Sequence, residues 1–579
     1  MGIAWSLIKN NLFLTLLFDW CNNCGILVVT MFIDDQIFNR GKKKYRRVLL
    51  RNSYRKNGKV CHDTIANLSK CDDEEVEAIK FALANKNKIK ALEAADLKFK
   101  TFQGLSVGAV WLLNQMAKRL GIVKALGNSP EARLSLWMVM ACVIGCVSRL
   151  SVARLGKRHA VCDVLNLDSF CEDDLYKAMD WLADNQKRIE QKLFNFCYQD
   201  VKPNLYLYDV TSSYLEGDQN ELGAYGYNRD KKTGKKQIVI GLLTDDKGRP
   251  ISCEVFQGNT QDPKTFKKQI DKLVHQFGID TVTMVGDRGM IKSAEIDELF
   301  AENFNYITAI TKPQIETLMK NNIIQMELFD NTVCEIEDGD IRYILKRNPV
   351  RVEEMSTTRQ SKLEKVQSYC NNRNIYLAEH PRAQIKVAQQ NVNKKIGKLK
   401  LGNWCCAGAN DCHLTIKIDE QKLEEDSRLD GCYVIKTDLS SKEASKEIIH
   451  DRYKSLAEVE WAFRTMKTTL LNIRGIFVRK ANRTRAHVFI IMLAYLIAYE
   501  LRRLWRDIDV TIQDAMDELS SICAHKMMIG KTSIHTIPIP RELGQQLLKK
   551  TQVTLPDAIP CGSNSVYTTK DLVEERRTV

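Results

Sequence analysis

The feature that most constrains the fold is a series of short apolar runs between residues 205 and 310. The first run, residues 205–210, is rich in aromatic and branched side chains and follows Pro203 and Asn204, as is typical of a buried strand. Two runs around a turn-rich segment indicate a hairpin, and a helical stretch and two more strands follow. The order β-β-β-α-β-α-β predicts an α/β fold. The later segments are residues 237–243, 251–256, 265–277, 281–285 and 306–310.

Two aspartates fall where strands of this series are expected to end. Asp209 closes the first apolar run, and Asp287 follows the strand at 281–285 within the segment from Gly286 to Gly289. A single aspartate at such a place is most often a turn former or a helix cap. Together, two carboxylates at the rim of a sheet are the oxygen ligands that Mg²⁺ prefers.

A third carboxylate lies on a helix expected over residues 451–467. Tyr453, Glu460 and Lys467 are spaced seven residues apart, so at roughly 100° per residue they fall within about 40° of one another on one helix face. A carboxylate flanked by a phenol and an ammonium suits a site that holds a metal ion beside a phosphate. The alternative is a solvated helix face that carries these side chains by chance.

These residues resemble bacterial insertion-sequence transposases of the DDE type, which carry the signature Y-(2)-R-(3)-E-(6)-K. Tyr453, Glu460 and Lys467 match the signature at its tyrosine, glutamate and lysine positions. The resemblance extends from about residue 206 to residue 485 and includes the segments at residues 208–212, 258–260 and 286–290. It implies a ribonuclease-H-like catalytic core.

The resemblance also implies a reaction. A DDE transposase cleaves phosphodiester bonds at transposon ends and joins the freed 3′-OH ends to target DNA, using Mg²⁺ or Mn²⁺, with two ions expected. By resemblance, Asp209, Asp287 and Glu460 are the catalytic and metal-binding triad. Tyr453 and Lys467 would contact DNA near the scissile phosphate. The implied partner is double-stranded DNA at both transposon ends and at the target, and action on two ends implies a homodimer on DNA.

One position departs from the signature. Its arginine falls on Leu456, which can make no phosphate contact. Arg464 shares the helix face and is a further candidate DNA contact, but eight residues place it about 12 Å from Leu456 along the helix. The departure puts one DNA contact in doubt and leaves the metal site untouched.

The distribution of charge agrees with a DNA-handling protein. The chain has 86 Lys and Arg against 72 Asp and Glu, a formal net charge of +14. Residues 40–59 and 461–499 contain ten and seven basic residues respectively, and neither segment contains an acid. Such segments neutralise DNA phosphates irrespective of sequence. A basic soluble surface is the alternative.

The spacing between Asp287 and Glu460 implies an inserted structure, because 173 residues are far too many for a loop. Strand-like segments and a long charged helix predict a sheet-rich insertion domain at residues 312–445. It would divide the catalytic core into residues 201–311 and 446–505. We expect an N-terminal α+β region that binds DNA ends at 31–200, an extension at 1–30 and a C-terminal region at 506–579.

The sequence favours a cytoplasmic, nucleoid-associated protein with no membrane role. The apolar segment at residues 12–18 is too short to span a bilayer, and the run at 488–499 is typical of a core helix. Eighteen cysteines in 579 residues are too sparse for a disulfide scaffold and indicate reduced thiols.

Two other functions are compatible with parts of the sequence. The segment from Gly104 to Gly108 matches G-x-S-x-G between a strand-like and a helix-like stretch, so Ser106 is a candidate nucleophile of a serine hydrolase. No second motif for an oxyanion hole accompanies it. The other alternative is a catalytically inactive DNA-binding transposase remnant, of which Leu456 could be an early sign.

Overall fold

The computed structural model describes residues 30–40, 43–56, 59–85, 100–145, 148–227, 229–230, 232–410, 413–468, 471–473, 476–529, 532–559, 564–568 and 570–571. Residues 1–29, which make up nearly all of the expected extension, lie outside them. The chain divides into two compact units, Met1–Phe102 with Lys526–Ile534, and Gln103–His525 with His535–Val579.

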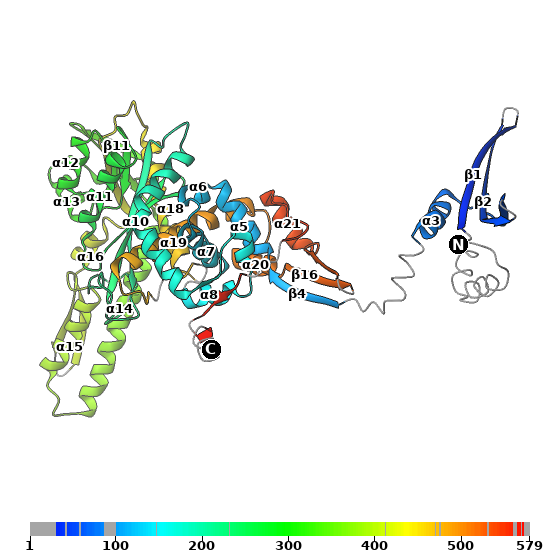
Figure 1. The fold of residues 1–579 in the computed structure, drawn as a ribbon. Helices are drawn as coiled ribbons and strands as arrows, with labels where there is room; N and C mark the ends of the chain where they lie inside the picture. Colours follow the sequence, from blue (N-terminus) through cyan, green and yellow to red (C-terminus); the bar gives the residue numbers. More distant parts are fainter. Residues whose placement is uncertain are drawn as a thin grey trace. The chain divides into compact units, whose positions relative to one another are not determined.

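Within its described residues, the first unit contains an antiparallel sheet and the helix α3 (Figure 1). The strands β1 (Thr30–Arg40), β2 (Lys43–Lys56) and β3 (Lys59–Asn67) follow one another directly in the sheet. Helix α3 (Asp73–Ala84) begins after Asp72, whose carboxylate accepts a hydrogen bond from the Glu75 N–H at 2.8 Å. Strands and a helix are therefore present in the part of the expected α+β region that contains the basic segment at residues 40–59.

The second unit is built on an eight-stranded mixed sheet with the strand order β11-β12-β15-β10-β9-β6-β7-β8. Strands β6, β7 and β8 form an antiparallel meander, whereas β6, β9 and β10 run parallel to one another. The predicted α/β class and the predicted order of elements along the chain are confirmed. These strands are β6 (Leu205–Tyr214), β7 (Gln237–Asp245), β8 (Pro250–Gln257), β9 (Thr283–Gly286) and β10 (Asn305–Ala309), with α11 (Asp262–His275) and α12 (Ser293–Ala301) between them.

Side-chain alternation along β6 assigns each face of the sheet to a different core. Tyr206 and Tyr208 pack with α11 and α12 on one face, whereas Leu205 and Leu207 pack with α18 (Leu456–Lys467) and α19 (Ala481–Leu504) on the other. Because successive residues of a strand point to opposite faces, Asp209 shares the face of Leu207. It therefore lies on the side of the sheet that α18 covers.

Helix α19 is the central helix of the larger core and contacts α7, α10 and β8. By length and composition α19 could cross a membrane, as could α7 and α8 taken together, but 83% of the apolar window of α19 is buried inside the protein. This burial is typical of a core helix. The surrounding helices are α5 (Gly108–Arg119), α6 (Ile122–Leu126), α7 (Pro130–Ile144), α8 (Arg149–Gly156), α9 (Val161–Leu165), α10 (Glu172–Cys197), α20 (Ile512–Ser520) and α21 (Glu542–Thr551). Short strands at β4 (Lys100–Ser106), β5 (Phe170–Cys171), β16 (Cys523–Ile529), β17 (Thr532–Thr536) and β18 (Val566–Tyr567) complete the chain.

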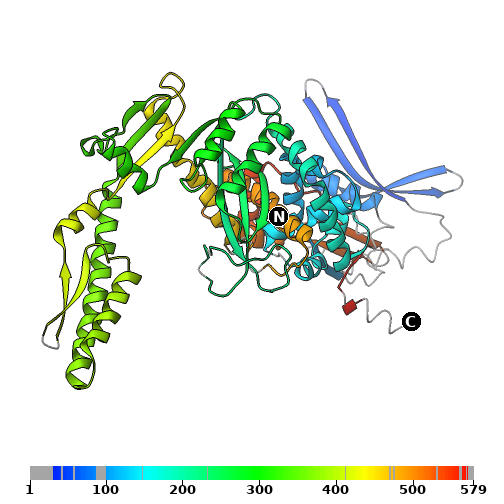
Figure 2. The ribbon, with the colours of Figure 1, turned by 90° about the vertical axis from the view of Figure 1, so that its left-hand side faces the viewer.

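The inserted segment has two parts. Three of its strands extend the core sheet beyond β10, and the long charged helix expected near residues 362–369 is present as α14. Figure 2 shows α14 and α15 side by side, and with the β13–β14 hairpin they enclose a core of their own around Val366, Val392 and Trp404. The elements are α13 (Lys312–Lys320), β11 (Cys334–Asp338), β12 (Ile341–Arg347), α14 (Pro349–Glu379), α15 (Ile385–Lys398), β13 (Cys405–Asn410), β14 (His413–Ile418), α16 (Glu420–Ser427) and β15 (Cys432–Thr437).

Candidate active site

Asp209 and Asp287 lie at the same level of the sheet. The parallel pairing of β6 with β9 runs from Leu205 opposite Thr283 to Tyr208 opposite Gly286, so the next residue on each chain is an aspartate. Asp287 follows the end of β9, as predicted. Asp209 was predicted at the end of its strand, and this is wrong, because β6 continues to Tyr214 through its antiparallel pairing with β7. Only the pairing with β9 ends beside Asp209.

The helix expected over residues 451–467 is interrupted at Ser455, which ends α17 (Lys446–Lys454) and precedes α18. The Ser455 hydroxyl donates to the carbonyl of Asp451, four residues back, at 3.1 Å. Such back-bonding by serine competes with the helical ladder and bends helices. Tyr453 therefore lies on α17 and Glu460 on α18, and the prediction of one continuous helix face was wrong.

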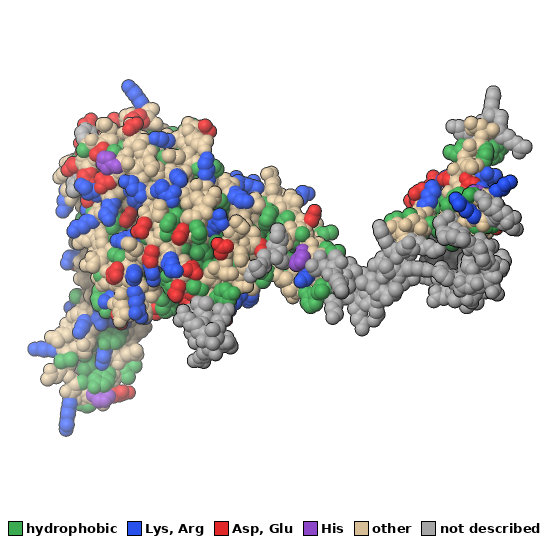
Figure 3. All heavy atoms as spheres, in the orientation of Figure 1, with side chains coloured by type: hydrophobic (Ala, Val, Ile, Leu, Met, Phe, Trp, Pro, Cys, Tyr) green, Lys and Arg blue, Asp and Glu red, His purple; other side chains and the backbone are tan. Residues whose placement is uncertain are grey.

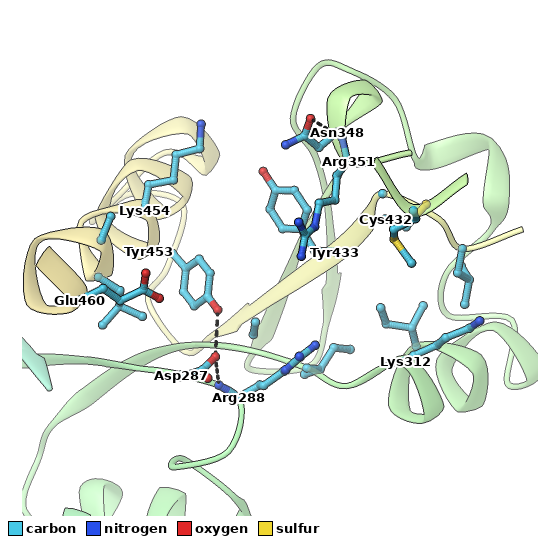
Figure 4. Close-up of a pocket in the computed structure, with 18 of the residues that line it drawn as sticks. Asp287, Arg288, Lys312, Asn348, Arg351, Cys432, Tyr433, Tyr453, Lys454 and Glu460 are labelled. Atoms are coloured by element: carbon cyan, nitrogen blue, oxygen red, sulfur yellow. Dashed lines mark hydrogen bonds between the residues drawn. The ribbon is translucent and has the colours of Figure 1, made fainter. Parts of the chain in front are cut away.

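Despite the break, Asp209, Asp287, Glu460 and Tyr453 line one cavity of about 740 Å³. Figure 4 shows Tyr453 and Glu460 on the helical side of the cavity and Asp287 on its floor. The opposite side is formed by the inserted segment, with Tyr433 and Arg351 among its residues. Four basic residues also line the cavity, Arg288, Lys312, Arg351 and Lys454.

The carboxylates of the cavity interact electrostatically. Burial raises the pKa of Asp209 to about 7, an effect opposed by the Val210 N–H and Arg229 and increased by Asp287 and Glu460. The Val210 N–H donates to Asp209 Oδ1 at 2.7 Å. The Asp287 Oδ1 atom in turn accepts hydrogen bonds from the Arg288 N–H at 2.8 Å and from the Tyr453 hydroxyl at 3.5 Å. Because burial and this carboxylate raise the pKa of Tyr453, its phenol stays protonated and remains a donor.

The donor set fits a divalent cation of the magnesium type. Three carboxylates border the cavity, and oxygen is the ligand atom that Mg²⁺ and Mn²⁺ accept. A cation among them would offset the repulsion by which Asp287 and Glu460 raise the pKa of Asp209. In the side-chain positions seen, no three carboxylates, imidazoles or thiols of the described residues are close enough together to hold one ion. Glu460 is exposed, so its side chain is free to turn toward the aspartates.

Lys467 and Arg464, the other predicted DNA contacts, do not line the cavity. The Lys467 ammonium lies 3.1 Å from Asp230 Oδ1, and the two side chains are only 10% and 2% exposed. Arg464 is exposed on α18. The structure therefore brings together four of the six predicted site residues and places Lys467 in a buried ion pair.

Leu456 begins α18 and lines the cavity, yet it is only 9% exposed and packs in the larger core. At the position of the signature arginine, this chain therefore has a side chain that packs in the core as well as bordering the cavity. Sequence reasoning missed the basic residues that border the same cavity. Arg288 and Lys454 adjoin Asp287 and Tyr453 in the sequence and could have been noted, whereas Lys312 and Arg351 reach the cavity only through the fold of the insertion.

Ser106 does not have the surroundings of a nucleophile. The expected strand and helix around it are present as β4 and α5. Its hydroxyl, however, donates to the Ser520 carbonyl at 2.7 Å, and the residue is only 6% exposed. The ring of His159, which is bridged to Ser106 through the backbone, has its Nδ1 atom 3.1 Å from the Leu155 carbonyl. A structural role accounts for Ser106, and the hydrolase interpretation was wrong.

Comparison with known proteins gives two family matches. The model described as "Transposase DDE domain" matches residues 201–497, and that of the "IS1634 family transposase, N-terminal domain" matches residues 36–96. The curated proteins contain no match. A solved structure, the piggyBac transposase synaptic complex with hairpin DNA, aligns with 81% of this chain and 86% of its own at 11% identity and a TM-score of 0.34, a likeness too weak to support an argument. The first family match covers more than half of the chain and includes every residue of the candidate triad.

Proposed function

Because this chain belongs to the DDE transposases, we propose that Asp209, Asp287 and Glu460 hold the divalent metal ions with which it cleaves and transfers DNA. The chain is a DNA transposase, and the family's reaction depends on a divalent metal. The single observation that carries the residue assignment is the pairing of β6 with β9. It aligns two aspartates on neighbouring strands beneath the helix that bears Glu460.

When bound, two Mg²⁺ or Mn²⁺ ions would supply an activated water for strand cleavage and stabilise the negative charge on the leaving 3′ oxygen. The protein's own part is to hold the carboxylates in place. Backbone N–H groups of Val210 and Arg288 each donate to an Oδ1 atom, which leaves the Oδ2 atoms of Asp209 and Asp287 available. Tyr453 further restrains Asp287 through its hydroxyl.

The DNA strand would lie between the helical side of the cavity and the inserted segment. Arg288 and Lys454 border it on one side and Lys312 and Arg351 on the other, so phosphates on either side of the scissile bond meet a cation. Arg464 would contact DNA outside the cavity, because it is exposed on α18. For Lys467 we replace the expected phosphate contact with a positioning role through Asp230.

The reaction would take place in two steps at this one site. Water first cleaves the phosphodiester bond at the transposon end and releases a 3′-OH. That hydroxyl then attacks a phosphodiester of the target strand, so that one bond forms as another breaks and the target's 3′ oxygen leaves. Cutting two ends in this way calls for two copies of the chain, and we propose a homodimer on DNA in the bacterial cytoplasm.

Substitution of single carboxylates tests the assignment. Asp209→Asn, Asp287→Asn and Glu460→Gln should each reduce Mg²⁺-dependent cleavage of DNA taken from the flanks of the native gene to background, while DNA binding is retained. Matched controls are Asp280→Asn and Glu458→Gln, exposed carboxylates that do not line the cavity, and both should cleave normally. Cleavage by any triad variant at the wild-type rate would remove that residue from the site.

A further inference from the structure

The β1 and β2 strands form a two-stranded ribbon beyond the point where the sheet has three strands. In the two-stranded part, β1 and β2 pair from Asp35 opposite Val48 to Arg40 opposite Lys43. Strand β3 pairs only with the section of β2 from Leu49 onward. No third strand of the described residues pairs with the ribbon. A ribbon of this kind has two faces, because opposed residues share a face and neighbours alternate.

On one face of the ribbon the charged side chains are engaged by the protein itself, although Ile37 on this face is 68% exposed. Val48 is 2% exposed, and the neighbouring Arg46 donates hydrogen bonds to both carboxylate oxygens of Asp35 and to Asp73 of α3. Lys80 of α3 also lies 3.4 Å from Asp35. Figure 3 shows acidic side chains gathered over α3 in this unit. Charge on this face is therefore largely neutralised by contacts within the protein.

The opposite face carries Gln36, Phe38, Tyr45 and Arg47. Phe38 and Tyr45 are directly opposed in the register and are 44% and 54% exposed. The Arg47 guanidinium carbon lies 4.8 Å from the centre of the Phe38 ring, and the group donates to Gln36 Oε1 at 3.1 Å. The next acid toward the base of this face, Asp34, is paired with Arg51 at 2.9 Å. The face is aromatic and basic, and its carboxylate at the base, Asp34, is neutralised by Arg51.

We propose that this face of the β1–β2 ribbon enters the major groove of duplex DNA and reads the sequence of the transposon end. The major groove, about 12 Å wide, admits a two-stranded ribbon. The side chains are of the types that read base edges there, since arginine pairs with guanine, glutamine with adenine, and aromatic groups contact the thymine methyl. The sequence around the junction of the two strands, residues 40–44, adds four basic residues, whose charge complements the phosphates.

Exposed aromatic side chains can also mark a contact with a second copy of the same chain. The charge of this face favours DNA over that alternative. Two copies of this face would bring Arg47 of one chain against Arg47 of the other, and Asp34 at the base of the face is already paired with Arg51. Duplex DNA offers the opposite charge. The inference rests on the transposase function, which requires the chain to recognise its ends, and it names the element that does so.

Binding by the full-length protein tests the proposal. The probes are duplexes that tile the DNA flanking the native gene, with a scrambled duplex of equal length, followed by fluorescence anisotropy. The double variant Phe38→Ala with Tyr45→Ala should bind the preferred duplex at least about tenfold more weakly, while its binding to the scrambled duplex changes less than about twofold. Phe81→Ala is the matched control, since Phe81 is a 68% exposed aromatic residue of α3, and it should change neither affinity.

The groove is tested by methylation interference, because dimethyl sulfate modifies guanine N7 in the major groove. Methylated guanines should weaken binding of the wild-type chain, and Arg47→Ala, which removes the arginine assigned to guanine, should lose this sensitivity. Interference that persists in Arg47→Ala, or a double variant with unchanged preference for the native end, would overturn the proposal. So would a change from dimer to monomer in sedimentation without DNA. If the wild-type chain prefers none of the flanking duplexes, the proposed recognition of transposon ends is wrong. If the wild-type chain prefers one of them and the double variant does so equally, only the role of the ribbon is wrong.

Discussion

The two sides of the active-site cavity are built in different ways. The acidic side consists of Asp209 on β6, Asp287 just after the parallel strand β9, and Glu460 on the helix that packs over β6. The opposite side comes from the inserted segment, where Arg351 begins a long helix and Tyr433 lies on β15 at the extended part of the sheet. The first side has the buried, paired backbone of the core sheet, whereas Arg351 is an exposed side chain held by a single ion pair with Glu354 at 2.6 Å.

This difference suggests a division of labour. A side that holds metal ions has to keep its ligands in fixed positions, and buried strands provide this. A side that grips DNA has to accommodate a strand that enters, moves and leaves, and exposed cations on long side chains suit that task. Substitutions on the acidic side should therefore affect stability and chemistry, whereas those on the insertion side should affect DNA affinity.

The largest effect on stability is expected at Lys467, which supports the acidic side from outside the cavity. Lys467→Ala would leave Asp230, 2% exposed, without the partner that now lies 3.1 Å away, and removal of one member of a buried ion pair typically destabilises by about 3–5 kcal/mol. Chemical denaturation measures this loss. The double variant Lys467→Gln with Asp230→Asn should recover part of it. If Lys467→Ala keeps full stability and loses only DNA affinity, the lysine grips DNA as the family signature implies.

A smaller loss is expected at Leu456, where the acidic side meets the larger core. Leu456→Arg removes a side chain that is only 9% exposed, and the lost apolar burial should lower the free energy of unfolding by about 2 kcal/mol. The guanidinium can reach the cavity, so cleavage by the folded protein should be retained. Leu456→Met is the conservative control for both assays. An arginine variant that melts like the wild type yet no longer cleaves would contradict the placement of DNA along α17 and α18.

The smallest of these effects is expected on the insertion side. Arg351→Ala should weaken binding of end DNA about tenfold through the loss of a phosphate contact, reduce the salt dependence of binding, and leave thermal stability unchanged. Arg382→Ala, an exposed arginine of the same insertion that does not line the cavity, is the matched control. A strong loss of cleavage at saturating DNA in Arg351→Ala would show that this side takes part in the chemistry, and the division of labour would fail.

The sequence predicted the acidic side well, because strands and helices leave periodic patterns that place Asp209, Asp287 and Glu460 on neighbouring elements. Two local details of the predicted strands and helices were wrong. The apolar run stops before Thr211, but the backbone of residues 211–213 still pairs with β7, and side-chain polarity does not report such pairing. The helix break at Ser455 depends on one hydroxyl that bonds back to Asp451, within a segment whose spacing looks continuous.

The insertion side could not be predicted, because no local pattern links Lys312 or Arg351 to a cavity that they reach through tertiary structure. The pairing of β15 with β10 brings Tyr433 to the site across more than 120 residues of sequence. The same holds for the ion pair between Lys467 and Asp230, two residues that lie 237 positions apart. Charged residues are expected at the surface, so only the fold could reveal that both are buried.

The most direct measurement is the binding of Mn²⁺ to the protein in complex with end DNA, followed by electron paramagnetic resonance. Wild-type protein should bind the ion at the site bordered by the two aspartates and Glu460, and Mg²⁺ should displace it. Asp209→Asn, Asp287→Asn and Glu460→Gln should each weaken binding, while Asp280→Asn and Glu458→Gln should bind as the wild type does. Mn²⁺ binding of wild-type strength in all three triad variants would contradict the account, because the ions that drive the reaction would then be held elsewhere.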